Sequence, residues 1–192
     1  MLAPWRSPLA RALHLNRSLV YARYVQLATV RPDGRPANRT VVFRGFLNET
    51  NALKFVTDTR SEKMAHLHHQ PWGEVCWYFP NSREQFRLGG PLTPVTADTV
   101  DESLLKARRI QWHDLSNAAR SQFAWANPGH PRDPQASFSP PPPDPNQPLP
   151  NFCLLLLQPV EVDHLQLRGD PQSRDRYWLQ ESGEWQQQAV NP

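Results

Sequence analysis

The stretch from Leu53 to Gly90, LKFVTDTRSEKMAHLHHQPWGEVCWYFPNSREQFRLGG, decides how the rest of the chain can fold. Its first part, Leu53–Thr57, alternates apolar and polar side chains, which is the period of a half-buried strand. The next segment, DTRSEK at 58–63, contains Thr59 and Glu62 at the spacing of a capping box. The sequence therefore predicts a strand that leads directly into a short helix.

The start of this helix is a candidate anion site. A helix's first turn has unpaired N–H groups and the positive end of the helix dipole, and Arg60, Ser61 and Lys63 add two cations and a hydroxyl. Met64 and Leu67 would face inward. The same pattern also fits a capped surface helix with two solvated cations, and the segment alone leaves both interpretations open.

Length and charge limit the possible classes of protein. The chain has 192 residues, enough for one domain with a full core and too few for two ordinary domains, so we expect a single domain over residues 1–192. A formal net charge of +3 suits an anionic ligand. It falls short of the dense Lys/Arg fields that bind nucleic acid non-specifically, so we expect no nucleic-acid partner.

The cysteines and apolar runs favour a soluble, cytoplasmic protein with no membrane partner. Cys76 and Cys153 lie far apart in apolar runs without CxxC or metal-ligand spacing, which is typical of buried free thiols in a reducing compartment. The longest apolar run, Cys153–Leu157, is too short to cross a bilayer, and no signal-peptide core is evident. His66 and His69 near Cys76 suggest a metal site only weakly, because a third ligand is missing; we expect exposed helix histidines and no metal.

The N-terminal segment to Pro32 has no Asp or Glu, while arginines recur among Leu and Ala. That composition also describes organellar transit peptides. The alternative is an ordered amphipathic helix over Ser7–Arg17, with Leu9, Ala12 and Leu13 facing inward.

Strand patterns separated by turn residues follow one another along most of the chain. Such closely spaced antiparallel strands form a meander that curls into a barrel, so we predict a mainly β fold with peripheral helices. The helices are expected near Val100–Trp112 and Ser116–Trp125, and the Pro-rich segment 127–150 is expected to be an extended loop. Strands are predicted at Tyr24–Val30, Arg39–Phe46, Leu53–Thr57, Glu74–Phe79, Glu84–Leu88, Phe152–Val162, Asp175–Glu181 and Trp185–Val190.

Several blocks of the chain, in order, resemble the pyridoxamine 5'-phosphate oxidase family: RTVVFR, FVTDTRSEK, SREQFRLGG, PLPNF, QSRDRYWL and a terminal VNP. No single block is specific, but their order and spacing together are. The resemblance implies an FMN-binding split β-barrel and a homodimer with the flavin at the subunit interface. It also implies that the acid-poor N-terminus belongs to the fold and is not a presequence.

The resemblance assigns cofactor contacts residue by residue. The strand Arg39 to Val42 would line the flavin, Arg44 stands where the family has a lysine near flavin and substrate, and Arg60 would replace a phosphate-binding arginine whose position here is Glu62. The full set of implied FMN-binding residues is Arg39, Thr40, Val41, Val42, Arg44, Thr57, Arg60, Ser61, Lys63, Gln85 and Arg176.

The substrate side matches the family less well. Where the family holds a phosphorylated vitamer with a tyrosine, an arginine and a serine, this chain has His113, Asn117 and Ser121, and an arginine and a histidine near the C-terminus become Gln172 and Arg174. The missing charge would have to come from Arg120 or Arg174, and Arg44 is a further substrate-side candidate. We therefore expect an FMN-dependent oxidoreductase for a small molecule with weak or absent oxidation of pyridoxamine 5'-phosphate; the alternative is a non-catalytic FMN or anion carrier.

Overall fold

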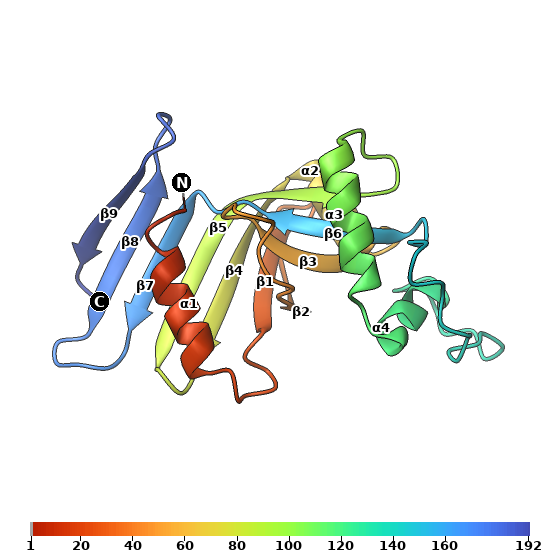
Figure 1. Cartoon of the computed structure of the whole chain (residues 1–192), viewed down its shortest axis with the longest axis horizontal. Helices are drawn as coiled ribbons and strands as arrows, with labels where there is room; N and C mark the ends of the chain where they lie inside the picture. Colours follow the sequence, from red (N-terminus) through yellow and green to blue (C-terminus); the bar gives the residue numbers. More distant parts are fainter. Residues whose placement is uncertain (1) are drawn as a thin grey trace.

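The computed structural model describes residues 2–192; Met1, at which the predicted domain begins, lies outside them. The fold is mainly antiparallel β with peripheral helices, as predicted (Figure 1). The strands are β1 Tyr24–Val30, β2 Pro36–Val42, β3 Leu53–Asp58, β4 Trp72–Phe79, β5 Glu84–Val95, β6 Phe152–Leu157, β7 Glu161–Gln166, β8 Ser173–Leu179 and β9 Trp185–Val190. The helices are α1 Arg6–Leu15, α2 Lys63–His69, α3 Glu102–His113 and α4 Asn117–Ser121, the last followed by a 3-10 turn, η1 Gln122–Ala124.

The long strand β5 joins two parts of the sheet. Its first half, Glu84–Gly89, pairs with β4 on one side and β7 on the other, whereas Leu92–Val95 pairs with β6. The strand changes partner at Gly90, where a Cβ atom would lie 2.0 Å from the Gln158 carbonyl oxygen, so only glycine fits there. Strands β1 to β6 curl around the core, and β7, β8 and β9 extend the sheet beyond the barrel.

The barrel is split between β2 and β3. The segment that follows β2 meets β3 through a bridge between Phe46 and Leu53 and through backbone bonds of Lys54 with Arg44 and Gly45. Beyond that point β2 pairs with β1, and β3 pairs with β6. The facing edges of β2 and β3 are therefore open to a ligand.

Helix α1 and the inward strand residues build one main core, in which Leu9, Trp77, Phe79 and Phe86 are fully buried. Ala12 of α1 is also buried, and Leu13 packs against the cluster, as the amphipathic pattern predicted. Helix α3 lies over the second part of the sheet (Figure 1). The N-terminal segment is thus an integral part of the fold.

The predicted capping box at Thr59 and Glu62 is wrong. Helix α2 begins only at Lys63, and Glu62 precedes it in a helical conformation without a side-chain capping bond. The turn before it is held instead by Asp58, whose carboxylate accepts the Arg60 backbone N–H. Met64 and Leu67 face inward as predicted.

Other element boundaries moved for identifiable reasons. The single strand expected over Phe152–Val162 is two strands, β6 and β7, because the chain turns at Gln158 to Val160. Helix α3 is capped by the Asp101 side chain and α4 by the Ser116 side chain. The Pro-rich segment 127–150 contains neither helix nor strand.

Within residues 2–192 no helix combines the length and apolarity that crossing a membrane requires. The same residues hold no cluster of three or more His, Cys, Asp or Glu side chains suited to a metal ion.

Candidate functional site

A cleft of about 740 Å³ opens at the split between β2 and β3. This volume is typical of small-molecule and cofactor sites. The inner wall is formed by the facing ends of the two strands and by the turn before α2, and the outer wall by α4, η1 and the start of the Pro-rich loop. All of the FMN-binding residues implied by the resemblance line this cleft except Gln85 and Arg176.

Lys63 lies at the inner end of the cleft between two hydroxyl groups. Its Nζ donates to Thr57 Oγ1 at 2.8 Å and to Ser61 Oγ at 2.7 Å. An ammonium has three donors, so one N–H remains for a ligand. Burial lowers the pKa of the Lys63 ammonium, and the nearby Arg39 lowers it further. A bound oxyanion would relieve both effects, which makes this group of residues well suited to a phosphate.

Arg39 connects the cleft to the interior of the barrel. Its Nη1 donates to the Leu27 carbonyl at 3.0 Å and to Thr29 Oγ1 at 2.7 Å. Thr29 in turn shares a hydrogen bond of 2.9 Å with Nδ1 of His66, which is only 4% exposed. The expectation that His66 is an exposed helix histidine is therefore wrong: it packs under β1 and supports Arg39.

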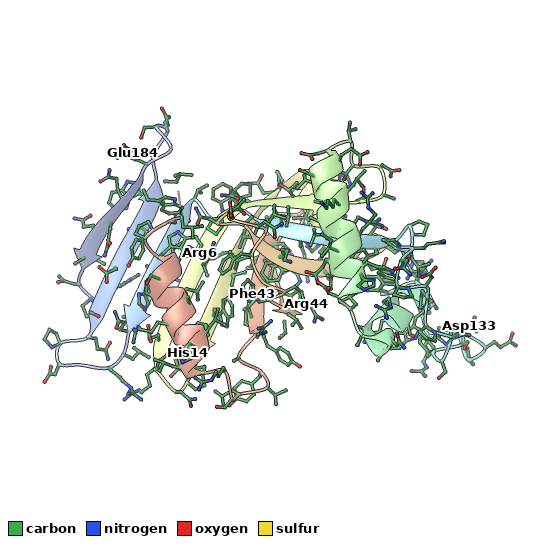
Figure 2. The ribbon with its side chains drawn as sticks, viewed as in Figure 1. Arg6, His14, Phe43, Arg44, Asp133 and Glu184 are labelled. Carbon is green, nitrogen blue, oxygen red and sulfur yellow. The ribbon has the colours of Figure 1, made fainter. Side chains whose placement is uncertain are left out.

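Two polar donors in the cleft lack partners among residues 2–192. The Nε atom of Arg44 and the indole Nε1 of Trp125 are both buried without a hydrogen bond. Figure 2 places Arg44 beside the barrel and Asp133 on the far loop that carries the outer wall. Unpaired buried donors are rare in folded proteins, and a ligand with acceptor atoms in this cleft would satisfy both.

Arg60 lines the cleft but directs all its donors at the protein. Its Nε and Nη2 bind the Asp58 carboxylate at 2.9 and 2.7 Å. The same guanidinium donates to the carbonyl oxygens of Phe123 and Trp125 at 3.2 and 3.0 Å and to Asn127 Oδ1 at 3.1 Å. A guanidinium has five N–H donors, and all five are used.

Gln85 and Arg176 lie away from the cleft, on the outer face of the sheet. Directly paired residues share a face, and a continuous row of pairs links Thr40 of β2 with Arg176 of β8. The row runs through Thr40, Gln26, Cys76, Arg87, Asp163, Arg176 and Gln188. Gln85 lies on the same face two residues from Arg87. The single chain therefore carries the predicted site as two separate groups of residues on one surface.

Comparisons with known proteins agree with this geometry. Residues 2–96 match the family model described as pyridoxamine 5'-phosphate oxidase, FMN-binding domain. The chain is also 38% identical over 194 residues to pyridoxine/pyridoxamine 5'-phosphate oxidase 2 of Arabidopsis thaliana, covering 100% of this chain and 98% of that protein. The chain belongs to the pyridoxamine 5'-phosphate oxidase family. The family domain binds FMN, which is therefore the cofactor.

Solved structures show the same fold. A pyridoxamine 5'-phosphate oxidase-related, FMN-binding protein from Nostoc punctiforme is 60% identical, with a TM-score of 0.96 and complete coverage of both chains. PhzG of Burkholderia lata is 18% identical with a TM-score of 0.77, covering 97% of this chain and 91% of that one. At this lower identity the likeness concerns the fold alone. The predicted split barrel is thus confirmed.

The substrate-side candidates on α4 and at the end of α3 lie outside the cleft. His113, Asn117, Arg120 and Ser121 are not among the residues that line the cleft. Arg120 is 5% exposed, and its Nη1 donates to the carbonyl oxygens at the end of α3, including that of His113 at 3.1 Å. Its Nη2 donates to Asn117 Oδ1 at 2.5 Å. Arg120 closes the α3–α4 junction within this chain, and its role in supplying the missing substrate charge stays a prediction.

Arg174 is also engaged by the protein. Its Nη2 donates to Asp163 Oδ2 at 2.7 Å, and the same carboxylate oxygen accepts from Arg87 at 2.8 Å. Burial acts to raise the pKa of the Asp163 carboxyl, but the bonds from Arg174 and Arg87 outweigh it and hold the pKa below its usual value. Gln172 is exposed in the loop before β8. Both residues remain predicted substrate contacts from the same outer sheet face as Arg176.

The outer wall of the cleft was missed by sequence reasoning. It contains Phe123 and Trp125, from the end of the segment expected to be a helix, and His130, Arg132 and Phe138, from the segment expected to be an extended loop. The aromatic and cationic residues scattered among its prolines were the available signal. Their position opposite β2 depends on contacts far apart in the sequence, which the loop's composition does not reveal.

Proposed function

We propose that this protein is an FMN-dependent oxidoreductase that acts on a small molecule, and that it works as a homodimer with the flavin at the subunit interface. The observation that carries this proposal is the split of the barrel, which brings the strand Arg39 to Val42 opposite Thr57, Ser61 and Lys63 in one cleft. When bound, the isoalloxazine ring supplies the hydride- or electron-accepting chemistry.

The chain's own residues supply binding and orientation. Lys63, with the hydroxyls of Thr57 and Ser61, would hold the FMN phosphate through charge-assisted hydrogen bonds. Arg39, fixed by its bonds to β1, would keep positive charge beside that phosphate. The unpaired Nε of Arg44 would meet an acceptor of the flavin or of the substrate.

The separation of the two groups of predicted residues supports the proposed homodimer. Gln85 and Arg176 lie on the outer sheet face, where a hollow of about 410 Å³ is lined by Arg87, Asp163 and Arg176. If one chain's outer face covers the cleft of a second copy, the partner's Gln85 and Arg176 complete the flavin site. Residues 1–192 would then form one domain per subunit, with the Pro-rich loop as part of it.

The test is the visible spectrum of the purified protein, followed by titration of the apoprotein with FMN and with riboflavin. Oxidised flavin is yellow, and a site built around Lys63 should prefer FMN by at least about tenfold, which corresponds to one charge-assisted bond. Equal affinity for the two flavins would exclude the phosphate assignment. A colourless protein that binds neither would exclude the function.

The substrate remains the open part of the proposal. The Arabidopsis relative is named for pyridoxine and pyridoxamine 5'-phosphate oxidation, which supports a phosphorylated vitamer. Because Arg120 and Arg174 are engaged within the protein, we expect this chain to oxidise pyridoxamine 5'-phosphate weakly or not at all. Oxygen uptake by the FMN-loaded protein checks this, and turnover near the median enzyme rate of about 10 per second would contradict it.

The engagement of Arg120 and Arg174 within the protein also favours a second candidate, a non-catalytic FMN or anion carrier on this barrel. A carrier would bind FMN and show no vitamer-dependent flavin reduction under anaerobic conditions. An oxidoreductase would lose its visible absorbance when its substrate is added.

A further inference from the structure

A single side chain ties the two walls of the cleft together. Arg60 belongs to the turn between β3 and α2, yet three of its five donors bind residues of the outer wall: the Phe123 and Trp125 carbonyl oxygens and the Asn127 side chain. The last of these partners is 67 residues away in the sequence. A guanidinium with all its donors occupied has none left for a phosphate.

Asp58 and Asn151 complete this connection. Asn151 Nδ2 donates to Asp58 Oδ2 at 2.7 Å and to the Phe123 carbonyl at 2.8 Å, so Asn151 bridges the Asp58 carboxylate and the outer wall. Burial acts to raise the pKa of Asp58, but hydrogen bonds from Arg60 and Asn151 outweigh it, and the pKa lies below its usual value. Asp58 is therefore charged at neutral pH and holds the Arg60 fork in a fixed orientation.

The outer wall continues from Trp125 to a free cation. The Trp125 ring meets Phe138 edge to face, with centroids 5.7 Å apart, and the Arg132 guanidinium lies 5.1 Å from the Phe138 ring centroid. Arg132 lines the cleft and has no salt bridge within the described part of the chain, residues 2–192. The unpaired indole N–H of Trp125 independently indicates that this wall meets ligand acceptor atoms.

We infer that Arg60 is a positioning residue that fixes the outer wall, Trp125 to Phe138, across the cleft, and that this wall presents Arg132 to an anionic small-molecule substrate. The inference rests on the proposed function, because the substrate would bind against FMN in this cleft. It replaces the direct phosphate contact that the family resemblance implied for Arg60, and leaves the phosphate to Lys63.

The role of Arg60 is tested by comparing Arg60→Ala with Lys63→Ala, both as purified full-length protein. Two quantities are measured: the ratio of FMN to riboflavin affinity, and the rate of chymotrypsin cleavage after Phe138 in the apoprotein. Proteolysis of a loop follows the population of its open form, so Arg60→Ala should raise cleavage by on the order of tenfold and keep the affinity ratio. Lys63→Ala should abolish the preference for FMN over riboflavin and leave the rate of cleavage unchanged.

The opposite pattern, a collapsed FMN preference in Arg60→Ala with unchanged cleavage, would overturn the inference. If Arg60→Ala does not fold, Asp58→Asn provides the same test, since it weakens the Arg60 fork without removing the guanidinium. Cleavage unchanged in that variant would equally overturn it. Because cleavage is measured without FMN, failure here is distinguishable from failure of FMN binding.

The role of Arg132 is tested on the FMN-loaded protein with pyridoxamine 5'-phosphate and pyridoxamine as probes, followed by flavin fluorescence. Arg132→Ala should reduce the preference for the phosphorylated probe by on the order of tenfold, the value of one charged hydrogen bond. Arg35→Ala, in the exposed turn between β1 and β2, is the matched control and should keep the preference. An unchanged preference in Arg132→Ala would overturn the assignment.

Discussion

At the scale of single residues, the cationic side chains in this cleft have different roles because their N–H donors have different hydrogen-bond partners. Lys63 donates two hydrogen bonds to hydroxyl groups and has one N–H left for a ligand. Arg60 donates all five of its N–H groups to protein acceptors. Arg44 leaves its Nε without a partner among residues 2–192. Which cations can bind a ligand therefore depends on the local acceptors and not on charge alone.

Thr57 provides a prediction at this scale. Its hydroxyl accepts a hydrogen bond from Lys63, and the residue is 6% exposed at the end of β3. Thr57→Val keeps the shape but removes this acceptor, so FMN affinity should fall by about 1 kcal/mol while riboflavin affinity stays constant. Thr57→Ser retains the hydroxyl and should bind FMN like the wild type. The measurement is flavin fluorescence titration; a parallel loss for riboflavin would show that the valine disturbs the ring site instead.

At the scale of elements, β5 and the outer sheet face are held by different forces. Strand β5 changes partner where glycine allows the Gln158 backbone to approach, so its continuity is a matter of space. The outer face between β5, β7 and β8 is held by charge, through Arg87, Asp163 and Arg174. The two features respond differently to substitution and to pH.

Gly90→Ala should destabilise the fold by about 3 kcal/mol, because the new methyl group would overlap the Gln158 backbone, which cannot move independently of β6. Gly89→Ala is the matched control: its Cβ would meet only the Glu161 side chain, at 2.8 Å, and that flexible carboxylate can rotate away. Urea denaturation measures both. Equal losses of unfolding free energy in the two variants would show that the close approach of the Gln158 backbone is not the cause.

Asp163 provides a pH-dependent prediction. Its folded-state pKa is depressed, so its contribution to stability is present above the ordinary aspartate pKa and is lost as pH falls through the folded value. Asp163→Asn should cost about 1 kcal/mol at pH 7, at the low end because solvent screens the partly exposed arginines. The cost should begin to shrink below about pH 4, where the unfolded-state carboxyl takes up a proton, and should vanish once the pH falls below the depressed folded-state pKa. A pH-independent difference in unfolding free energy would contradict the ion-pair explanation.

At the scale of the whole molecule, one surface carries two separate parts of the predicted flavin site. The cleft is open at the split of the barrel, and the outer sheet face bears Gln85, Arg176 and the 38% exposed Trp178. If two copies associate about a two-fold axis, the outer sheet face of each copy can cover the cleft of the other. The proposed homodimer would bury both.

Trp178→Glu should therefore convert the dimer to a monomer and weaken FMN binding, because a charge would be placed in the apolar part of the interface. Val100→Glu, at a position 92% exposed and away from this face, should leave both mass and affinity unchanged. Light scattering gives the mass, and flavin titration gives the affinity. A monomeric wild type that still binds FMN tightly would contradict the dimeric site.

Local periodicity and spacing were enough to predict where most strands lie along the chain, which helix faces point inward, and the cationic turn at residues 58–63. Strand β1 was predicted at its observed limits. Boundaries failed where a distant contact intervenes, as at Gln158 to Val160, where the backbone turns to pair first with β5 and then with β8.

The sequence by itself determined that cations and hydroxyl groups gather directly after β3, since Thr59, Arg60, Ser61 and Lys63 are near neighbours in the chain. Only the tertiary structure decided which of them can bind a ligand. Three of the five hydrogen bonds of Arg60 go to residues 123–127, and Arg120 donates to carbonyl oxygens at the end of α3. A donor's availability depends on every acceptor within about 3 Å of it, and the chain assembles those acceptors only when it folds.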